Sequence, residues 1–228
     1  MRILGLIPAR GGSKGIPGKN AKLLAGKPLL AYTAEAALQA QGLDKVVFSS
    51  EDDKLIALAE KAGLDVPFKR PADLATDAAS SLSVVQHALA ELEAAGDRYD
   101  AVCLLQVTTP MRNAADIDSA IESFRESQAD ALVSVIPVPH QYNPHWVLMQ
   151  EGADRLQWSM GKKIIGRRQD LPKAYIRDGS IYITKTKVIQ AGSLYGEQLA
   201  FYEMDPESHV NIDTQEDWQR ATELLSDN

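Results

Sequence analysis

Short apolar runs alternate with longer segments of helical periodicity as far as Pro137. This alternation is typical of βαβ units around a mostly parallel sheet. The predicted central strands are residues 2–9, 45–49, 101–106 and 131–137.

Between these runs, apolar residues recur at three- and four-residue spacing, which predicts helices that cover the sheet. Pro28 stands at a position suited to the first turn of the first of these helices. The predicted helices are residues 28–41, 52–63, 80–96 and 113–127.

The pattern changes after Pro137. Residues 138–172 contain several prolines, Trp146, Trp158 and two of the four histidines, and they show no long helical period. We expect this segment to form an excursion from the core. Residues 1–228 thus predict a single domain that carries the excursion within it.

Regular patterning returns in the last part of the chain. Residues 180–184 and 198–204 predict two strands, and residues 214–225 predict a C-terminal helix. Thr214 is its expected N-cap, because a hydroxyl can accept a hydrogen bond from a free N–H of the first turn.

Composition narrows the class of protein. A chain of 228 residues with 45% hydrophobic content can bury a sizeable α/β core. The single cysteine, Cys103, excludes a disulfide framework, and its apolar neighbours favour a buried inert thiol over a nucleophile. That thiol, the absence of a signal-peptide pattern and the absence of a membrane-length apolar window lead us to expect a cytoplasmic protein without membrane contact.

The formal net charge of −7 disfavours nucleic-acid binding, because surfaces that bind polyanions need basic patches. Any phosphate binding must therefore be local.

The most basic loop, "IPARGGSKGIPGKN" at residues 7–20, follows the first predicted strand. Ligands of open parallel sheets bind at this end of the strands. The loop is not a P-loop, because Ser13 replaces the required glycine and Asn20 follows the lysine in place of Ser or Thr. The dinucleotide fingerprint is also absent, and Pro17 stands where its helix would begin.

What remains is a set of glycine N–H groups able to bind an anion, with positive charge from Arg10, Lys14 and Lys19. The alternative is a flexible surface turn.

Five ordered motifs carry a resemblance over nearly the whole chain. They are the loop above, "RPADLATDAASS" from Arg70, "LLQVTTPMR" from Leu104, "RRQDLPKAYIRDGSIYI" from Arg167 and "NIDTQEDW" from Asn211. Together they resemble the N-acylneuraminate cytidylyltransferases (CMP-sialic acid synthetases). The resemblance implies a three-layer α/β fold of the nucleotide-diphospho-sugar transferase type, with a small dimerisation excursion.

The activity that the resemblance implies is transfer of CMP from CTP to the anomeric hydroxyl of a nine-carbon α-keto acid sugar, with release of pyrophosphate. Such a reaction needs in-line attack at the α-phosphorus, cations that neutralise the phosphates, and Mg²⁺ to orient them. Catalysis is then mainly positioning and electrostatics. No general base is identifiable from the sequence.

The resemblance assigns roles in CTP binding to residues of the first two motifs. Arg10 and Lys19, also expected to be catalytic, contact the phosphates. Ser80 and Ser81 also suit the start of a helix, and both roles can coexist. The predicted nucleotide-binding residues are Arg10, Gly12, Ser13, Lys19, Asn20, Arg70 and Ser81.

The sugar carries a carboxylate, so its site needs a cation of its own. Arg168 is the first choice, since arginine can bind a planar carboxylate by two parallel hydrogen bonds. Arg112 suits either an anion contact near the sugar or a structural link for its loop, and Tyr182 suits the core equally well. The predicted sugar-binding residues are Gln106, Arg168, Gln169, Tyr175 and Tyr182.

By the same resemblance, Mg²⁺ is expected at Asn211 and Asp213, and Asp213 is the third expected catalytic residue. The family reads Asp-Ile-Asp where this chain has Asn-Ile-Asp, so one ligand is neutral. His140, His145 and His209 lack the spacing of metal ligands, and ordinary polar or interface contacts are expected of them.

Trp146 stands where some sialic acid enzymes place a lysine, which favours a related sugar such as legionaminic or pseudaminic acid. The alternatives are a nucleotidyltransferase for 3-deoxy-manno-octulosonate or for a sugar 1-phosphate, and a noncatalytic nucleotide-binding module. The resemblance also implies a homodimer in which Leu194 and Tyr195 reach the neighbouring site.

Overall fold

Six strands form the main sheet in the computed structural model, which describes residues 1–13, 15–161, 164–207 and 209–226. Every neighbouring pair is parallel except the two pairs that the third strand in this order makes. The predicted mostly parallel sheet is confirmed. Across the sheet the strands are β10 (Leu199–Glu203), β6 (Ala131–Pro137), β9 (Tyr175–Lys185), β5 (Ala101–Leu105), β1 (Ile3–Pro8) and β4 (Lys45–Ser49).

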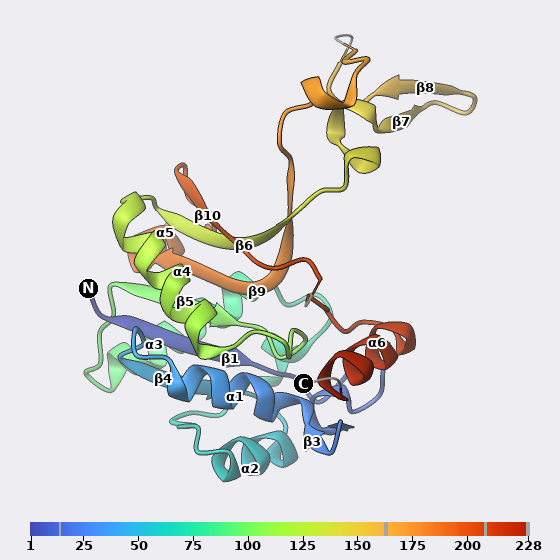
Figure 1. The fold of residues 1–228 in the computed structure, drawn as a ribbon. Coiled ribbons are helices and arrows are strands. Elements are labelled where there is room, and N and C mark those ends of the chain that lie inside the picture. The colour runs from blue at the N-terminus through green and yellow to red at the C-terminus, as the bar shows by residue number, and fades with distance from the viewer. Residues whose placement is uncertain (14, 162–163, 208, 227–228) are drawn as a thin grey trace.

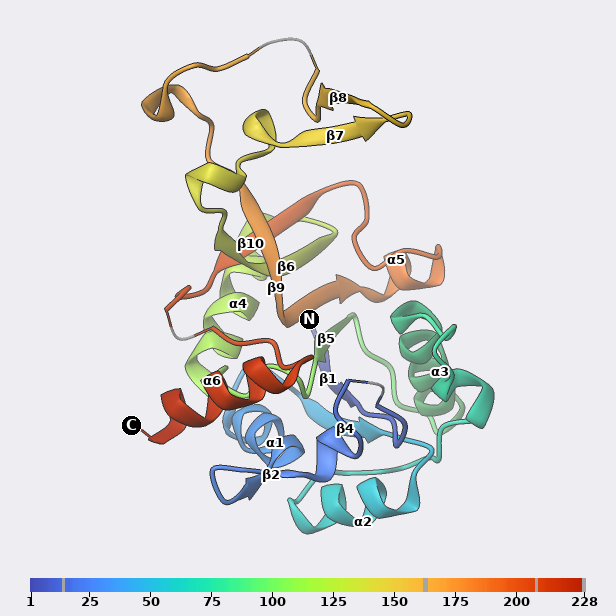
Figure 2. The ribbon, with the colours of Figure 1, turned by 90° about the vertical axis from the view of Figure 1, so that its right-hand side faces the viewer.

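Helices cover both faces of this sheet, which gives the three layers visible in Figure 2. On one face lie α1 (Leu29–Gln39), α4 (Ala114–Ser127) and α6 (Gln215–Ser226), and on the other lie α3 (Ser81–Ala94) and α5 (Thr186–Gln190). The helix α2 (Asp53–Lys61) contacts α1 and β4.

The layers follow from the strand sequences, because successive side chains of a strand point to opposite faces. In β1, Ile3 and Ile7 pack into the core cluster on the side of α1, whereas Leu4 and Leu6 pack into the cluster on the side of α3. A strand that is apolar at nearly every position can therefore bury both faces.

Polar side chains fix the starts of the helices. Asp52 accepts hydrogen bonds from the backbone N–H groups of Lys54 and Leu55 at the start of α2. Thr214 and Asp217 cap each other's backbone N–H at the start of α6, so the predicted N-cap is confirmed. Pro28 is the residue before α1 and not part of its first turn, because it ends the short strand β3 (Lys27–Pro28), which pairs with β2 (Leu23–Leu24).

Cys103 lies at the centre of β5 and is fully buried. Burial disfavours the charged thiolate and raises the pKa of Cys103 to about 12. The prediction of a buried inert thiol is confirmed.

The chain leaves the sheet at the end of β6 and returns at the start of β9, and the segment between them projects from the main body (Figure 1). The sequence did not predict its β-hairpin, because the strands are short and Leu148 and Leu156 are exposed. The segment contains the strands β7 (Leu148–Glu151) and β8 (Arg155–Trp158) and the 3₁₀ turns η3 (His140–Tyr142), η4 (Pro144–Trp146) and η5 (Arg168–Asp170).

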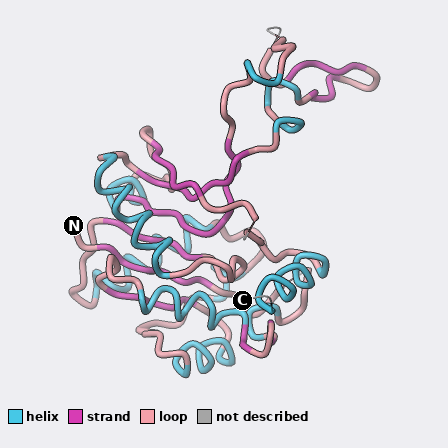
Figure 3. The backbone as a smooth tube through the Cα atoms, viewed as in Figure 1, coloured by secondary structure: helices cyan, strands magenta, loops and turns pink. Residues whose placement is uncertain are grey.

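Figure 3 shows the loops at the carboxyl ends of β1, β4 and β5 together with the segment that leads into α6. Two further 3₁₀ turns lie here, η1 (Lys19–Ala21) and η2 (Ala72–Ala75). No helix in the described part of the chain is both long and apolar enough to cross a membrane.

Candidate functional site

A cavity of about 400 Å³ lies at the carboxyl ends of β1 and β5. The glycine-rich loop forms one wall, the residues after β5 form a second, and the segment before α6 closes the third. Parallel strands bring these loops together because all of them end at the same edge. Of the predicted site residues, the cavity is lined by Arg10, Ser13, Lys19, Asn20, Gln106 and Asp213.

A second cavity of about 210 Å³ adjoins the first and shares Arg10 with it. Arg70 and Ser81 line this second cavity. The structure thus spreads the predicted nucleotide-binding residues over two connected spaces with Arg10 between them.

Lys19 is 7% exposed and ties the glycine-rich loop to the far end of the chain. Its Nζ donates to the carbonyl oxygen of Ile212 and lies 3.0 Å from Oδ1 of Asp213. The carbonyl of Ile212 and this carboxylate compensate for the burial of the ammonium group.

The same loop is held at two further points. Asn20 donates from Nδ2 to the carbonyl oxygen of Arg10 at 3.0 Å. A Cβ on Gly15 would lie 2.2 Å from the carbonyl oxygen of Asp213, so the loop approaches this segment as closely as only glycine allows.

The remaining cations of the site also face carboxylates. Arg10 Nη1 lies 2.7 Å from Asp77 Oδ1. Arg70 is buried, and its Nη2 donates to Glu51 Oε2 at 2.8 Å and to the carbonyl oxygen of Ala9 at 2.6 Å.

Gly12 is exposed, and a Cβ there would meet no atom within 4 Å. This open backbone suits the expected cradle of N–H groups. Lys14, the other cation considered in this loop, lies outside the described residues.

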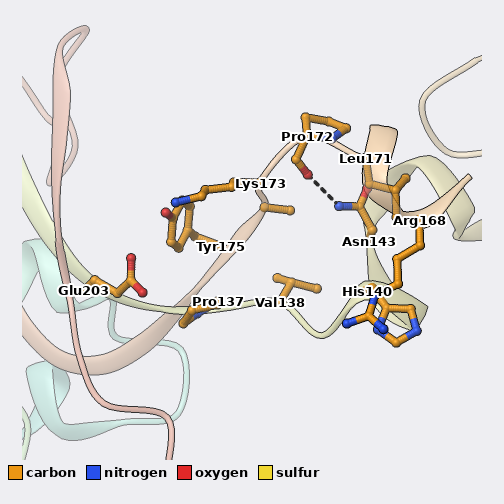
Figure 4. Close-up of a pocket in the computed structure, with 11 residues that line it drawn as sticks. Pro137, Val138, His140, Asn143, Arg168, Leu171, Pro172, Lys173, Tyr175 and Glu203 are labelled. Atoms are coloured by element: carbon orange, nitrogen blue, oxygen red, sulfur yellow. Dashed lines mark hydrogen bonds between the residues drawn. The ribbon is translucent and has the colours of Figure 1, made fainter. Parts of the chain in front are cut away.

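The sugar-site prediction is divided by the structure. Gln106 lines the first cavity, whereas Arg168 and Tyr175 line another cavity of about 250 Å³ at the base of the excursion. Figure 4 shows Arg168 beside His140, with Tyr175 and Lys173 on the side of Glu203.

The other two predicted sugar residues lie elsewhere. Gln169 is exposed in η5, and Tyr182 lies in β9 and packs against the core cluster on the side of α3. Within one chain, these side chains do not converge on the cavity that Gln106 lines.

Arg112 is buried beneath the first cavity and has structural contacts. It donates to the carbonyl oxygens of Gln106 and Ser180, at 3.3 and 2.8 Å, and to Thr33 Oγ1 at 2.7 Å. Burial lowers the pKa of Arg112 to about 10. These bonds link the loop after β5 to α1 and β9.

The predicted metal residues differ in their surroundings. Asp213 points into the first cavity, where it meets Lys19. The amide of Asn211 lies against Gly179, within 3.5 Å of where a Cβ would stand. In the described ranges, no group of three or more His, Cys, Asp or Glu side chains is placed to hold a metal ion.

Comparison with known families agrees with this geometry. The family described as cytidylyltransferase matches residues 4–227. The chain belongs to the cytidylyltransferase family.

Curated relatives of similar length share about a third of their residues with the chain. A pseudaminic acid cytidylyltransferase of Campylobacter jejuni is 33% identical, over 100% of this chain and 98% of the relative. A CMP-N,N'-diacetyllegionaminic acid synthase of Legionella pneumophila is 34% identical, over 99% of this chain and 97% of the relative. An N-acylneuraminate cytidylyltransferase of Escherichia coli is 32% identical, over 96% of this chain and 51% of the relative.

Solved structures share the fold. A CMP:2-keto-3-deoxy-manno-octonic acid synthetase complexed with CTP superposes with a TM-score of 0.74 at 17% identity, over 100% of this chain and 99% of the other. A 4-diphosphocytidyl-2C-methyl-D-erythritol synthase from Anaerococcus prevotii gives 0.69 at 13% identity, over 99% and 96%. Family and fold confirm the predicted nucleotidyltransferase class and its nucleotide-diphospho-sugar transferase type of fold.

The histidines of this cytidylyltransferase lie outside both cavities of the loop edge. His140 stacks edge-on against Trp146, and His145 donates its backbone N–H to Asn143. His209 Nδ1 lies 3.4 Å from Asp178, and burial lowers the pKa of His209 despite that carboxylate.

Sequence reasoning missed Glu51 and Asp77, the carboxylates that face Arg70 and Arg10. One signal for Glu51 was available, because it directly follows a predicted central strand at the edge where the site lies. Its partners are distant in the chain and left no local pattern.

Gly15→Ala should reduce kcat/KM for CTP about 10- to 100-fold, because the methyl group forces the loop away from Asp213 and displaces the phosphate site. Gly12→Ala, whose methyl group enters open space, should lose less. Steady-state kinetics of both variants, with circular dichroism to establish folding, provide the comparison. Equal losses would contradict the close approach at Gly15.

Proposed function

We propose that the protein transfers CMP from CTP to the anomeric hydroxyl of a nonulosonic acid and releases pyrophosphate. The observation that carries the proposal is the pair of adjoining cavities that Arg10 connects, at the carboxyl ends of the strands. Relatives of matching length named for pseudaminic and legionaminic acid support this choice of sugar class.

In this proposal the triphosphate occupies the larger cavity and the cytidine the smaller one. Arg10 and Lys19, with the open backbone at Gly12 and Ser13, supply positive charge and N–H donors to the phosphates. Ser81 offers a hydroxyl to the ribose from the other cavity. A cytoplasmic location accords with the use of CTP.

The sugar would enter beside Gln106, whose amide can both donate to and accept from a hydroxyl. Attack at the α-phosphorus then requires the anomeric hydroxyl in line with the departing pyrophosphate. Arg168 remains the residue we propose for the sugar carboxylate, with Gln169, Tyr175 and Tyr182 as further candidates.

We tie the proposed role of Arg168 to a homodimer, because within one chain it stands apart from Gln106. The excursion and β10 expose large apolar side chains, a pattern that marks protein interfaces. Leu148, Leu156, Leu199 and Phe201 are 44, 64, 50 and 52% exposed.

Leu194 and Tyr195 are the residues proposed to reach the partner's site. Tyr195 accepts a hydrogen bond from Arg177, and Leu194 packs against the core cluster on the side of α3. Both side chains are half-buried, which leaves part of each surface for a partner.

The metal proposed for the reaction is Mg²⁺, which when bound would draw charge from the phosphates and orient them. Mg²⁺ commonly takes one or two protein carboxylates together with substrate phosphates, so Asp213 with a neutral neighbour is a fitting donor set. Asn211 would join Asp213 only through its amide oxygen. Lys19 competes with the ion for the Asp213 carboxylate.

A product assay decides the substrate. The protein, CTP and Mg²⁺ should convert one member of a mixture of nonulosonic acids into a CMP-sugar, identified by mass, with an equal amount of pyrophosphate. Turnover of 3-deoxy-manno-octulosonate or a sugar 1-phosphate alone would favour the other nucleotidyltransferase. Nucleotide binding without any turnover would favour the noncatalytic module.

Asp213→Ala should nearly abolish turnover, because it removes the one carboxylate proposed for the metal. Asn211→Asp should keep the fold and lower the Mg²⁺ concentration that gives half-maximal rate. A magnesium titration of both variants measures this. An unchanged midpoint in Asn211→Asp together with an active Asp213→Ala would exclude the metal from this segment.

Light scattering at micromolar concentration should give the mass of a dimer. Phe201→Asp, which places a charge in the proposed interface, should give monomers with much lower turnover. Leu38→Asp is the matched control, since Leu38 is 46% exposed on α1 and lies away from the excursion. A fully active monomer would contradict the shared site.

A further inference from the structure

Glu51 is the first residue beyond β4 and bridges two parts of the nucleotide site. Its Oε1 accepts the backbone N–H of Gly11 at 2.7 Å, and its Oε2 accepts Nη2 of Arg70 at 2.8 Å. The two oxygens of one carboxylate therefore join the start of the glycine-rich loop to the arginine of the adjoining cavity.

Further contacts close this bridge into a ring. The same Nη2 of Arg70 donates to the carbonyl oxygen of Ala9 at 2.6 Å, and the backbone N–H of Arg70 donates to Ser50 at 3.0 Å. The loop, the end of β4 and the segment before η2 are thereby connected through buried or half-buried groups.

The start of the loop has no room to move toward Glu51. A Cβ on Gly11 would lie 2.3 Å from Oδ2 of Asp52, so the backbone already packs against the residue after Glu51. The Gly11 N–H is committed to the carboxylate, and the N–H groups left to bind an anion begin at Gly12.

Charge requires that this carboxylate be paired. An isolated anion beside the cavity would repel a triphosphate, whereas Glu51 has the Arg70 guanidinium as its partner. Arg70 is 4% exposed, and its Nε has no hydrogen-bond partner among the described residues. The contacts that set the direction of this guanidinium thus come through Nη2, from Glu51 and Ala9.

We propose that Glu51 is a positioning residue for the nucleotide. It holds Gly11 and Arg70 in one fixed arrangement and so orients the loop that receives the triphosphate. The inference rests on the proposed function, because it concerns the binding of CTP to that same site.

Glu51→Gln tests the bridge with little change in volume. An amide has one acceptor oxygen and one donor group, so it can serve Gly11 or Arg70 but not both. Loss of one charge-assisted hydrogen bond in a partly buried site should weaken CTP binding about 10- to 100-fold. Calorimetric titration with CTP, in the absence of the sugar, measures this dissociation constant.

Two further readouts distinguish positioning from general stability. Hydrogen exchange in the peptide covering residues 7–13 should be faster in Glu51→Gln, because the Gly11 amide loses its fixed acceptor. In turnover, KM for CTP should rise while KM for the sugar stays unchanged. Glu60→Gln, an exposed change on α2, is the matched control and should behave as the wild type.

If Glu51→Gln does not fold, Glu51→Asp serves instead. It keeps the charge beside Arg70, but it is one methylene too short to reach both partners, so CTP binding should again weaken. Wild-type protein that binds no CTP would contradict the proposed function itself. Wild-type binding with an unchanged dissociation constant in the folded variant, or a loss only of active fraction, would overturn the role of Glu51.

Discussion

The ammonium group of Lys19 is the contact on which the site depends. It is almost completely buried, and it is bonded to the carbonyl of Ile212 and to the carboxylate of Asp213, which lies 194 positions further along the chain. A buried lysine without such partners would be strongly destabilising. The first loop and the last segment before α6 therefore hold each other in place, and the larger cavity lies between them.

The electrostatics of the site follow from the same economy of charge. The chain has a net charge of −7, and each predicted cation faces a carboxylate: Arg10 faces Asp77, Lys19 faces Asp213 and Arg70 faces Glu51. A triphosphate entering this edge must exchange places with some of these anions or share their cations. Affinity then depends on how well the pairs are arranged, and a metal ion at Asp213 would have to compete with Lys19.

The excursion has a different relation to the core. It leaves the sheet after β6, rejoins it at β9, and exposes apolar side chains that the core of one chain does not cover (Figure 1). Arg168 and Tyr175 belong to its base and not to the edge where the loops meet. The proposed division of labour is thus physical: the sheet edge holds the nucleotide, and the excursion supplies surface for a sugar and a partner.

Local patterns in the sequence determined the parallel strands, the helices around them and the position of the basic loop. Apolar runs such as residues 101–106 and the cap at Thr214 act over a few residues, so they can be found without knowledge of the rest of the chain. The motifs also indicated the residues of the nucleotide cavities. The reversed direction of β9, the pairing of Arg70 with Glu51 and the separation of Arg168 from Gln106 were decided only by the tertiary structure. Each depends on contacts between residues far apart in the chain, whose energies no local pattern records.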